Sequence, residues 1–317
     1  MLKRCEILRT AALAPLALLG ATRTARAAFE PLQIAGVPSE DMTDCYYAVK
    51  TGMFTRNGLD VSLVATSSGA AATAAVVSGT YPIGKSSLLA LMNAHLKGIP
   101  LVAVAPAILN EPQNPRSLLQ IAPDSPYKTG ADLNGKTIGV PALGDATTLA
   151  IRAWVDKTGG DWHSLKFVEF PNAALEAAIV AHRVDAAILQ TPQLDISLEA
   201  GTTKTLSYAN EAIAPRFILA GYVALADWTL HHTDEVRTFA STLASATTYV
   251  NTHRPETAPV VAEFTKATLA NVAKMHRTTN PTVLDPALIQ PLIDAAAKYG
   301  ILARAFPARE IIWPGLK

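Results

Sequence analysis

The sequence alternates short apolar segments with longer amphipathic ones, and it does so in two separate runs. The first run covers residues 32–105 and the second covers residues 136–189. Between them lies a polar, proline-rich segment, residues 110–116 (NEPQNPR). Strand-like segments that alternate with helix-like ones are typical of a largely parallel sheet covered by helices, and a proline-rich break is typical of a connection between units. The chain is therefore expected to form two α/β units.

The individual elements follow from the same pattern. Strands are expected at residues 32–37, 60–64, 101–105, 136–140, 165–169, 185–189 and 217–225. Helices are expected at residues 43–56, 69–78, 87–97, 146–157 and 173–182, and most of the chain from Asp234 onward is expected to be helical.

This order of elements predicts two lobes with a cleft between them. The apolar segment 217–225 follows the second α/β unit and leads into the helical C-terminal part. We expect residues 28–117 and 218–317 to form the first lobe and residues 118–217 to form the second.

The first 27 residues have the three parts of a secretory signal peptide. Lys3, Arg4 and Arg9 make a basic start, residues 11–21 are apolar, and Ala25-Arg26-Ala27 is a small-x-small cleavage site. The apolar part is too short for a stable membrane span. We expect export and cleavage near Ala27, and a buried N-terminal helix is the alternative.

Charge and cysteine content limit the partners. Removing the leader takes five of the 27 Lys and Arg residues and one of the 26 Asp and Glu residues, which leaves 22 basic against 25 acidic side chains. A net charge of about −3 argues against nucleic acid as a partner, because phosphate backbones require a basic surface. Cys45 is then the one remaining cysteine, so no internal disulfide can form.

One segment matches the phosphate-binding loop pattern G-x-x-x-x-G-K-[ST], namely GTYPIGKS at residues 79–86. A phosphate loop follows a strand and precedes a helix, but the residues before Gly79 are helical in composition. Pro82 also lacks one of the N–H groups that such a loop uses. Asp227 could serve as the acid that binds Mg²⁺, yet an exported protein has little access to nucleoside triphosphates. We do not expect nucleotide binding.

Three longer segments carry a family resemblance. They are GLDVSLVATSSGAAATAAVVSGTYPIG (58–84), ADLNGKTIGVPALGDATTLAIRAWVDKTGGDW (131–162) and VEFPNAALEAAIVAHRVDAAILQTP (168–192). In this order they resemble the periplasmic solute-binding proteins of the nitrate, sulfonate, taurine and thiamine-pyrimidine group of ABC importers. Two residues depart from that pattern, Pro82 where the family often has Asp and Thr191 where it often has Glu.

The resemblance implies an α/β, two-lobed type II periplasmic binding protein with parallel-rich sheets. Such a protein is a periplasmic monomer without cofactor or catalytic activity, which binds a small organic solute and passes it to an ABC permease. A sulfonate, a taurine-like compound, a pyrimidine and an aromatic acid all remain open as the solute. Two alternatives also remain: an enzyme like the thiamine-pyrimidine synthases, whose cysteine-rich motif this chain lacks, and a binding protein that signals to a receptor.

Candidate ligand contacts lie where strands end and helices begin, because ligands of α/β proteins bind at the carboxyl ends of the strands. Serine hydroxyls and glycine N–H groups there can hold an anion or a polar ring edge, and Asp44 and Tyr47 could contact an amine or stack on a ring. The candidates in the first lobe are Ser39, Asp44, Tyr47, Ser67, Ser68, Gly69, Ser86 and Ser87.

The second lobe and the strand that returns from it supply the remaining candidates. These are Gly144, Asp145, Thr147, Gln190, Thr191 and Tyr222. Asp145 would favour an amine or an N–H ring over an anion if it faced the cleft, and helix capping is its alternative role, as it is for Ser68. His231, His232 and Asp234 have a metal-like spacing, but no further ligand accompanies them, so no metal site is expected.

Overall fold

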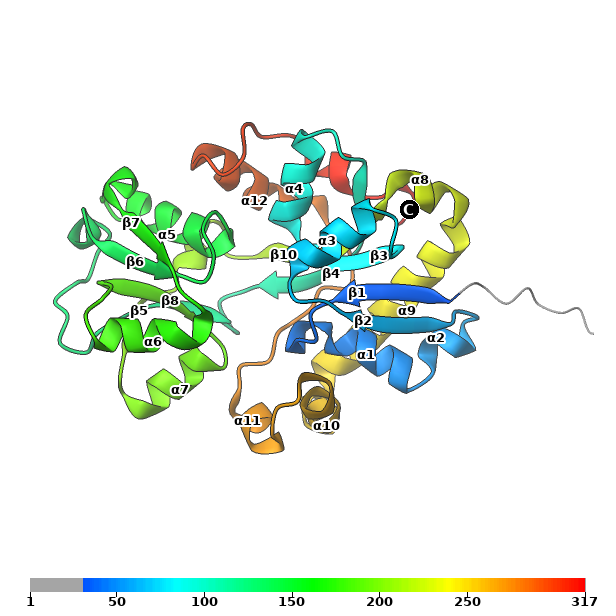
Figure 1. Cartoon of the computed structure of the whole chain (residues 1–317), viewed down its shortest axis with the longest axis horizontal. Coiled ribbons are helices and arrows are strands. Elements are labelled where there is room, and N and C mark those ends of the chain that lie inside the picture. Colours follow the sequence, from blue (N-terminus) through cyan, green and yellow to red (C-terminus); the bar gives the residue numbers. More distant parts are fainter. Residues whose placement is uncertain (1–30, 317) are drawn as a thin grey trace, which may run out of the picture.

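Two five-stranded sheets, each covered by helices, make up the protein in the computed structural model, which describes residues 31–316 (Figure 1). The first sheet has the order β2-β1-β3-β10-β4 and contains β1 (Leu32–Gly36), β2 (Val61–Ala65), β3 (Ile83–Ser87), β4 (Leu101–Asn110) and β10 (Phe217–Leu225). The second has the order β7-β6-β8-β5-β9 and contains β5 (Ser117–Ile121), β6 (Thr137–Val140), β7 (Lys166–Glu169), β8 (Ala186–Gln190) and β9 (Lys204–Ser207). We call the parts around the two sheets the first and second lobes.

Both sheets are mixed. In the first, β1 runs parallel to β2 and β3, whereas β10 is antiparallel to β3 and β4. In the second, β6 runs parallel to β7 and β8, whereas β5 is antiparallel to β8 and β9. The connection between lobes explains the antiparallel strands, because β5 and β10 each enter their sheet from the other lobe.

Helices cover the sheets. They are α1 (Thr43–Lys50), α2 (Met53–Arg56), α3 (Gly69–Val77), α4 (Leu88–Leu96), α5 (Ala146–Lys157), α6 (Asn172–Val180), α7 (Gln193–Ala200), α8 (Ala226–His231), α9 (Thr233–Thr252), α10 (Arg254–Thr265), α11 (Leu269–Lys274) and α12 (Pro286–Lys298). Each helix expected from the sequence is present, whereas α7 and α8 were not expected. The single helix expected at residues 43–56 is divided into α1 and α2, because Gly52 adopts φ 70° between them.

Sequence patterns missed three strands, β3, β5 and β9. The segment that forms β3 contains Gly, Lys and two Ser residues, which favour a turn, yet its first four residues are buried in the middle of the sheet. The strand expected at residues 101–105 continues through Pro106 to Asn110. Proline is tolerated there because β4 is an edge strand. The signal peptide predicted for residues 1–27 lies outside the described residues.

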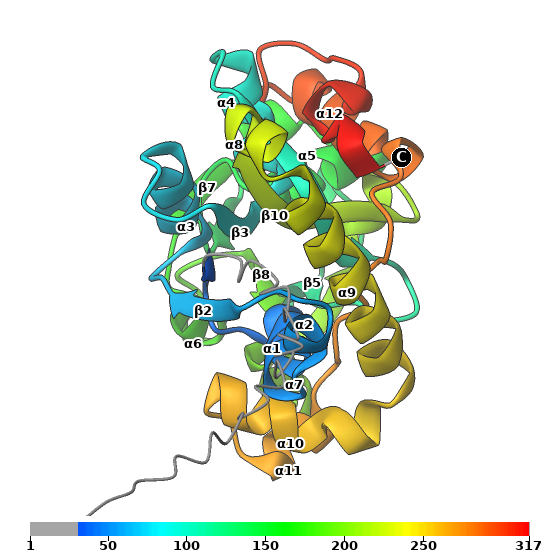
Figure 2. The same cartoon turned by 90° about the vertical axis from the view of Figure 1, so that its right-hand side faces the viewer.

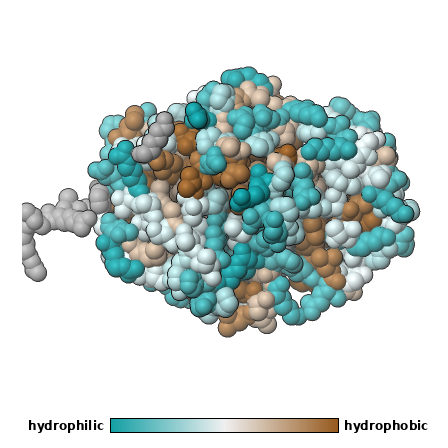
Figure 3. Space-filling model, turned by 180° about the vertical axis from the view of Figure 1, so that it is seen from behind, coloured by the Kyte–Doolittle hydropathy of each residue, from teal (hydrophilic) through white to brown (hydrophobic). Residues whose placement is uncertain are grey.

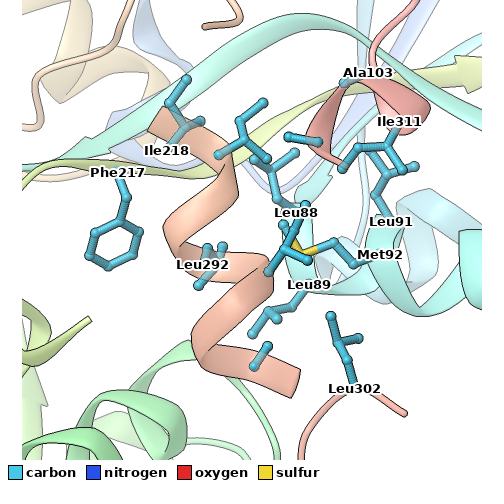
Figure 4. Close-up of a cluster of buried hydrophobic side chains, with 14 of the residues drawn as sticks. Leu88, Leu89, Leu91, Met92, Ala103, Phe217, Ile218, Leu292, Leu302 and Ile311 are labelled. Atoms are coloured by element: carbon cyan, nitrogen blue, oxygen red, sulfur yellow. The ribbon is translucent and has the colours of Figure 1, made fainter. Parts of the chain in front are cut away.

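An apolar core joins the two lobes on one side. It contains Leu88 and Met92 of α4, Phe217 of β10 and Leu292 of α12 (Figure 4). It continues to Leu149 of α5 in the second lobe. Figures 1 and 2 place α4 and α12 on the side of the molecule opposite α10 and α11. The two sides of the interlobe contact therefore differ in chemistry, as described below.

The surface seen from behind carries apolar residues in separate patches between hydrophilic ones (Figure 3). Among residues 31–316, no helix combines the length and the apolar composition that a membrane span requires.

Candidate functional site

A cavity of about 310 Å³ lies between the two lobes. It is located at the carboxyl ends of β3 and β8 and beside the first residues of α3 and α5, where α/β proteins bind ligands. The first lobe contributes Val37, Ser39, Gly69, Lys85, Ser86, Ser87, Ile108, Leu109, Asn110, Leu219 and Ala220 to its lining, and the remainder of the chain contributes Asn114, Arg116, Ser117, Asp145, Ala146, Thr147, Gln190 and Asn210.

Lys85 forms a buried ion pair at the first-lobe wall of this cavity. Its Nζ donates to Asp41 Oδ2, and the side chains are 9% and 6% exposed. Ser39 Oγ donates to Asp41 Oδ1 at 2.5 Å. Burial by itself would raise the pKa of Asp41, but the charges of Lys85 and Arg116 and the hydrogen bonds from Lys85 and Ser39 outweigh it, so this pKa lies well below its ordinary value. The positive charge of Lys85 is thereby neutralised within the wall.

The same lysine belongs to the phosphate-loop pattern, and its surroundings are not those of a phosphate loop. The segment that precedes Gly79 is the helix α3, and Gly79 itself adopts φ 73° just after the helix ends. The Gly-Lys-Ser part lies inside β3, where its backbone pairs with β10. The backbone N–H groups therefore do not form the nest that would hold phosphates.

Arg116 lines the cavity with its hydrogen-bonding capacity unused. It lies in the segment that connects β4 to β5, and its side chain is 31% exposed. Its NH1 atom is 3.9 Å from Asp41 Oδ2, which is too far for a hydrogen bond. Its Nε is buried without a partner among the described residues. A guanidinium in this state can bind an acceptor group on a ligand.

A polar network adjoins Arg116 at the back of the cavity. Asn110 Oδ1 accepts from Tyr208 OH at 2.9 Å and from Asn210 Nδ2 at 2.7 Å. Asn210 Nδ2 also lies 3.3 Å from Ser117 Oγ. Asn110 is 5% exposed, and its Nδ2 has no partner among the described residues. The network therefore fixes Asn110 and leaves one of its buried donors free.

Asp145 caps α5 at the second-lobe wall. Its Oδ1 accepts from Thr147 N at 2.9 Å, Thr148 N at 3.0 Å and Thr147 Oγ1 at 2.6 Å. Burial raises the pKa of Asp145, and the hydrogen bonds from Thr147 and Thr148 oppose this rise. Oδ2 accepts no hydrogen bond from the described residues, so the carboxylate keeps one oxygen for another partner.

Seven of the predicted contacts line the cavity, namely Ser39, Gly69, Ser86, Ser87, Asp145, Thr147 and Gln190. Most of their hydroxyls are used inside the protein. Ser39 donates to Asp41, Ser86 accepts from Thr73 at 2.6 Å, and Ser87 accepts from Ala90 N at 3.2 Å as the cap of α4. The serines therefore shape the first-lobe wall more than they offer free donors.

Three other predicted contacts lie away from the cavity, each for a packing reason. Tyr222 is fully buried and packs edge-to-face on Phe239, with ring centroids 5.5 Å apart. Asp44 is buried and accepts from Thr247 and Asn280. Tyr47 stacks on Tyr249 with centroids 5.1 Å apart. We leave all three out of the proposed site.

The remaining predicted residues, Ser67, Ser68, Gly144 and Thr191, also do not line the cavity. Ser68 is exposed and caps α3 by accepting from Ala71 N at 3.1 Å, which is the alternative role considered for it. Gly144 is exposed and adopts φ 72°, and Thr191 N donates to Arg116 O at 3.0 Å.

Sequence reasoning missed Lys85, Arg116, Asn110 and Asn210 as cavity residues. In the sequence, Lys85 stands out only through the phosphate-loop pattern. Arg116 and Asn110 bound the proline-rich segment that was identified as a crossing between lobes, and a crossing lies at the back of the cleft. The location of Arg116 and Asn110 at this crossing was the sequence signal that could have identified them as cavity residues.

Within residues 31–316, no group of three His, Cys, Asp or Glu side chains is arranged to hold a metal ion. His232 Nδ1 lies 3.0 Å from Glu235 Oε2, and His231 Nδ1 lies 2.9 Å from Asp227 O. These contacts are local to α8 and the start of α9.

The two mixed sheets, their order and the cavity between them define a type II periplasmic binding protein fold. A model of the NMT1/THI5-like family matches residues 39–258, and the chain belongs to this family.

Among curated proteins, the chain is 26% identical over 151 residues to the formylaminopyrimidine-binding protein of Halalkalibacterium halodurans. The match covers 48% of this chain and 44% of that protein, so the chain spans less than half of the length of this relative.

Solved structures of binding proteins share the fold. The periplasmic aliphatic sulphonate binding protein SsuA of Escherichia coli has a TM-score of 0.73 and 18% identity, with 90% of this chain and 92% of that chain covered. The alkanesulfonate-binding protein SsuA of Xanthomonas axonopodis pv. citri, bound to MOPS, has a TM-score of 0.69 and 17% identity, with 89% and 98% covered.

Proposed function

We propose that this protein is the extracytoplasmic solute-binding component of an ABC importer, and that it holds a small organic solute in the cavity between its lobes. The observation that carries the proposal is the cavity itself, because both lobes contribute polar side chains to it at the carboxyl ends of their strands. Membership of the NMT1/THI5-like family and the printed names of the relatives support it.

The fold supports a simple cycle of capture and release. A solute that contacts both lobes stabilises the arrangement in which they enclose it, because a ligand shifts a conformational equilibrium through its differential contacts. The two connections between lobes, residues 111–116 and 213–216, would take up the motion. The partner that receives the solute is an ABC permease, and the protein acts as a periplasmic monomer after cleavage near Ala27.

A thermal-shift panel on the exported protein tests the proposal. The panel contains taurine, alkanesulfonates, nitrate, a hydroxymethylpyrimidine and aromatic carboxylates. A ligand at about 100 times its dissociation constant adds roughly 2.7 kcal/mol to the free energy of unfolding. At this chain length, the melting temperature should rise by at least a few degrees.

Two controls separate this function from its alternatives. The solute should be recovered chemically unchanged after long incubation, whereas an enzyme would convert it. Native mass spectrometry of the purified protein reveals any solute that already fills the cavity. A flat panel together with an empty cavity by mass spectrometry would contradict the proposed function.

A further inference from the structure

Three polar side chains lie in a fixed order along one edge of the second sheet, and this order bears on the solute. Asp145 follows β6, Gln190 ends β8, and Arg116 immediately precedes β5. β8 lies between β6 and β5, and Ser117 at the start of β5 pairs with Gln190. Neighbouring strands are about 4.8 Å apart, so the ends of β6 and β5 at this edge are separated by roughly 10 Å. Asp145 lies five residues beyond the end of β6, at the start of α5.

The Arg116 end of this edge needs an acceptor. Arg116 Nε and Asn110 Nδ2 are buried donors without partners among the described residues. Both side chains line the cavity. Buried donors of this kind are rarely left unpaired, because an unsatisfied polar group is costly in a low-dielectric site. A carboxylate or sulfonate group carries several acceptor oxygens, which suit donors of both kinds.

The Asp145 end needs a donor. The helix-capping bonds occupy Oδ1, and Oδ2 accepts none from the described residues. A bare anion would be repelled at this end. An ammonium or amine group in the same place would form a charge-assisted hydrogen bond.

The first-lobe wall adds no net charge to this pattern. Lys85 is held by Asp41, and Ser39 also donates to Asp41. Across the cavity, Lys85 and Arg116 are balanced by Asp41 and Asp145. Arg116 in the connection between lobes and Asp145 in the second lobe therefore decide which charges a solute can carry.

We propose that the solute carries an anionic acceptor group, which binds Arg116 and Asn110, and an N–H donor group, which binds Asp145, so that it is close to neutral overall. This inference rests on the proposed function and names the class of solute. A cavity of about 310 Å³ has room for a compact molecule, since one water occupies about 30 Å³ of liquid volume.

Matched pairs of compounds test the inference by isothermal titration calorimetry. Each ω-amino carboxylate of three to six carbons is compared with the carboxylate of the same length, and taurine is compared with ethanesulfonate. At least one amino compound should bind roughly tenfold or more tightly than its partner without nitrogen, the factor typical of a charge-assisted hydrogen bond.

Asp145→Asn is the matched variant, because asparagine still caps a helix but carries no charge. It should reduce the preference for the amino compound to about twofold or less and leave the carboxylate's affinity unchanged or higher. Asp285→Asn is its control, since Asp285 caps α12 by accepting from Ala287 N and does not line this cavity. Arg116→Gln should weaken both members of a pair alike, and Arg304→Gln, at an exposed arginine, should weaken neither.

Equal or tighter binding of the compounds without nitrogen would overturn the inference, as would an Asp145→Asn variant that weakens both members equally. The inference would also be overturned if no compound of any pair bound measurably. The proposed function fails separately, and only if the wider thermal-shift panel and mass spectrometry are also negative.

Discussion

Single residues of this protein take their roles from burial and from their nearest partners. Lys85 occupies the lysine position of a phosphate-loop pattern, yet its charge is used by Asp41 inside the wall of the cavity. Arg116 stands in a proline-rich connection and has hydrogen-bonding capacity to spare. Lys85, which the sequence pattern marks as a ligand-binding cation, is thus neutralised. Arg116, which no motif marks, is available to a ligand.

Asp41→Asn should lower the free energy of unfolding by about 3–5 kcal/mol at pH 7, because it leaves Lys85 buried without its counter-charge. The folded-state pKa of Asp41 lies below its value in the unfolded chain, which is about 4. The stabilisation from Asp41 is therefore present above pH 4 and is lost as the pH falls through the folded-state pKa. Urea unfolding of both proteins between pH 3 and pH 8 measures this difference.

The exposed Asp124→Asn change is the control for that series and should shift stability by less than about 0.5 kcal/mol. A penalty for Asp41→Asn that stayed constant down to pH 3 would show that the ion pair does not carry the effect.

The chain should not bind Mg-ATP. The backbone of residues 83–87 pairs within the sheet and does not wrap around phosphates. Equilibrium dialysis with radiolabelled ATP and Mg²⁺ measures this directly. Saturable binding that Lys85→Ala abolished would refute the structural argument against the phosphate-loop pattern.

Secondary-structure elements meet across the cleft in two chemically different ways. On one side, α5 packs on α12 through the apolar core, with Arg152 NH1 donating to Tyr299 O at 2.9 Å. On the other side, α7 faces α11 and the residues after it through charged groups. His276 Nδ1 lies 2.5 Å from Asp195 Oδ1, and Lys274 Nζ lies 2.8 Å from Glu199 Oε1. Separation of the lobes is therefore expected to begin on the α7 side.

Replacing His276 and Lys274 together by Ala should raise the dissociation rate of a bound solute by roughly twofold to thirtyfold. The estimate follows from two ion pairs, Lys274–Glu199, which is exposed, and His276–Asp195, which is partly buried, each contributing about 0.2–1 kcal/mol to the closed arrangement. Stopped-flow fluorescence with displacement of the solute measures the rate.

Lys298→Ala is the comparison on the other side, because Lys298 pairs with Asp156 across the α5–α12 contact at 2.8 Å. The apolar core remains there, so the rate should change little. Equal acceleration by both variants would argue against opening on the α7 side.

The whole molecule is built from two similar α/β units, and its function depends on how they meet. Each lobe has its own sheet and buried clusters, and the cavity exists only where both contribute. Binding of a solute to both lobes should therefore change their arrangement as well as their stability.

Small-angle X-ray scattering should show a smaller radius of gyration for the solute-bound protein than for the solute-free one, since a bound solute favours the enclosed arrangement. Arg116→Gln at the same solute concentration should keep the larger radius if the solute no longer binds. An unchanged radius in the protein with demonstrated binding would mean that the lobes do not move.

The sequence by itself determined the α/β class, most of the strands and helices, and the family to which the chain belongs. The class and the elements follow from periodicity and capping residues, which are local properties of the chain, and the family follows from the resemblance of three segments to it. Local rules failed at β3, because a Gly-Lys-Ser segment becomes a strand only when neighbouring strands pair with it.

Only the tertiary structure decided which side chains share the cavity. Ser39, Asp145 and Gln190 were predictable because they follow strands at the edge where ligands bind. Lys85 and Arg116 both approach Asp41 from segments far apart in the sequence, and Tyr222 is turned into the core on the strand that runs beside Lys85. Such pairings depend on how elements pack and on which side chains burial leaves without partners. Local sequence patterns reveal neither, because both depend on contacts between distant segments.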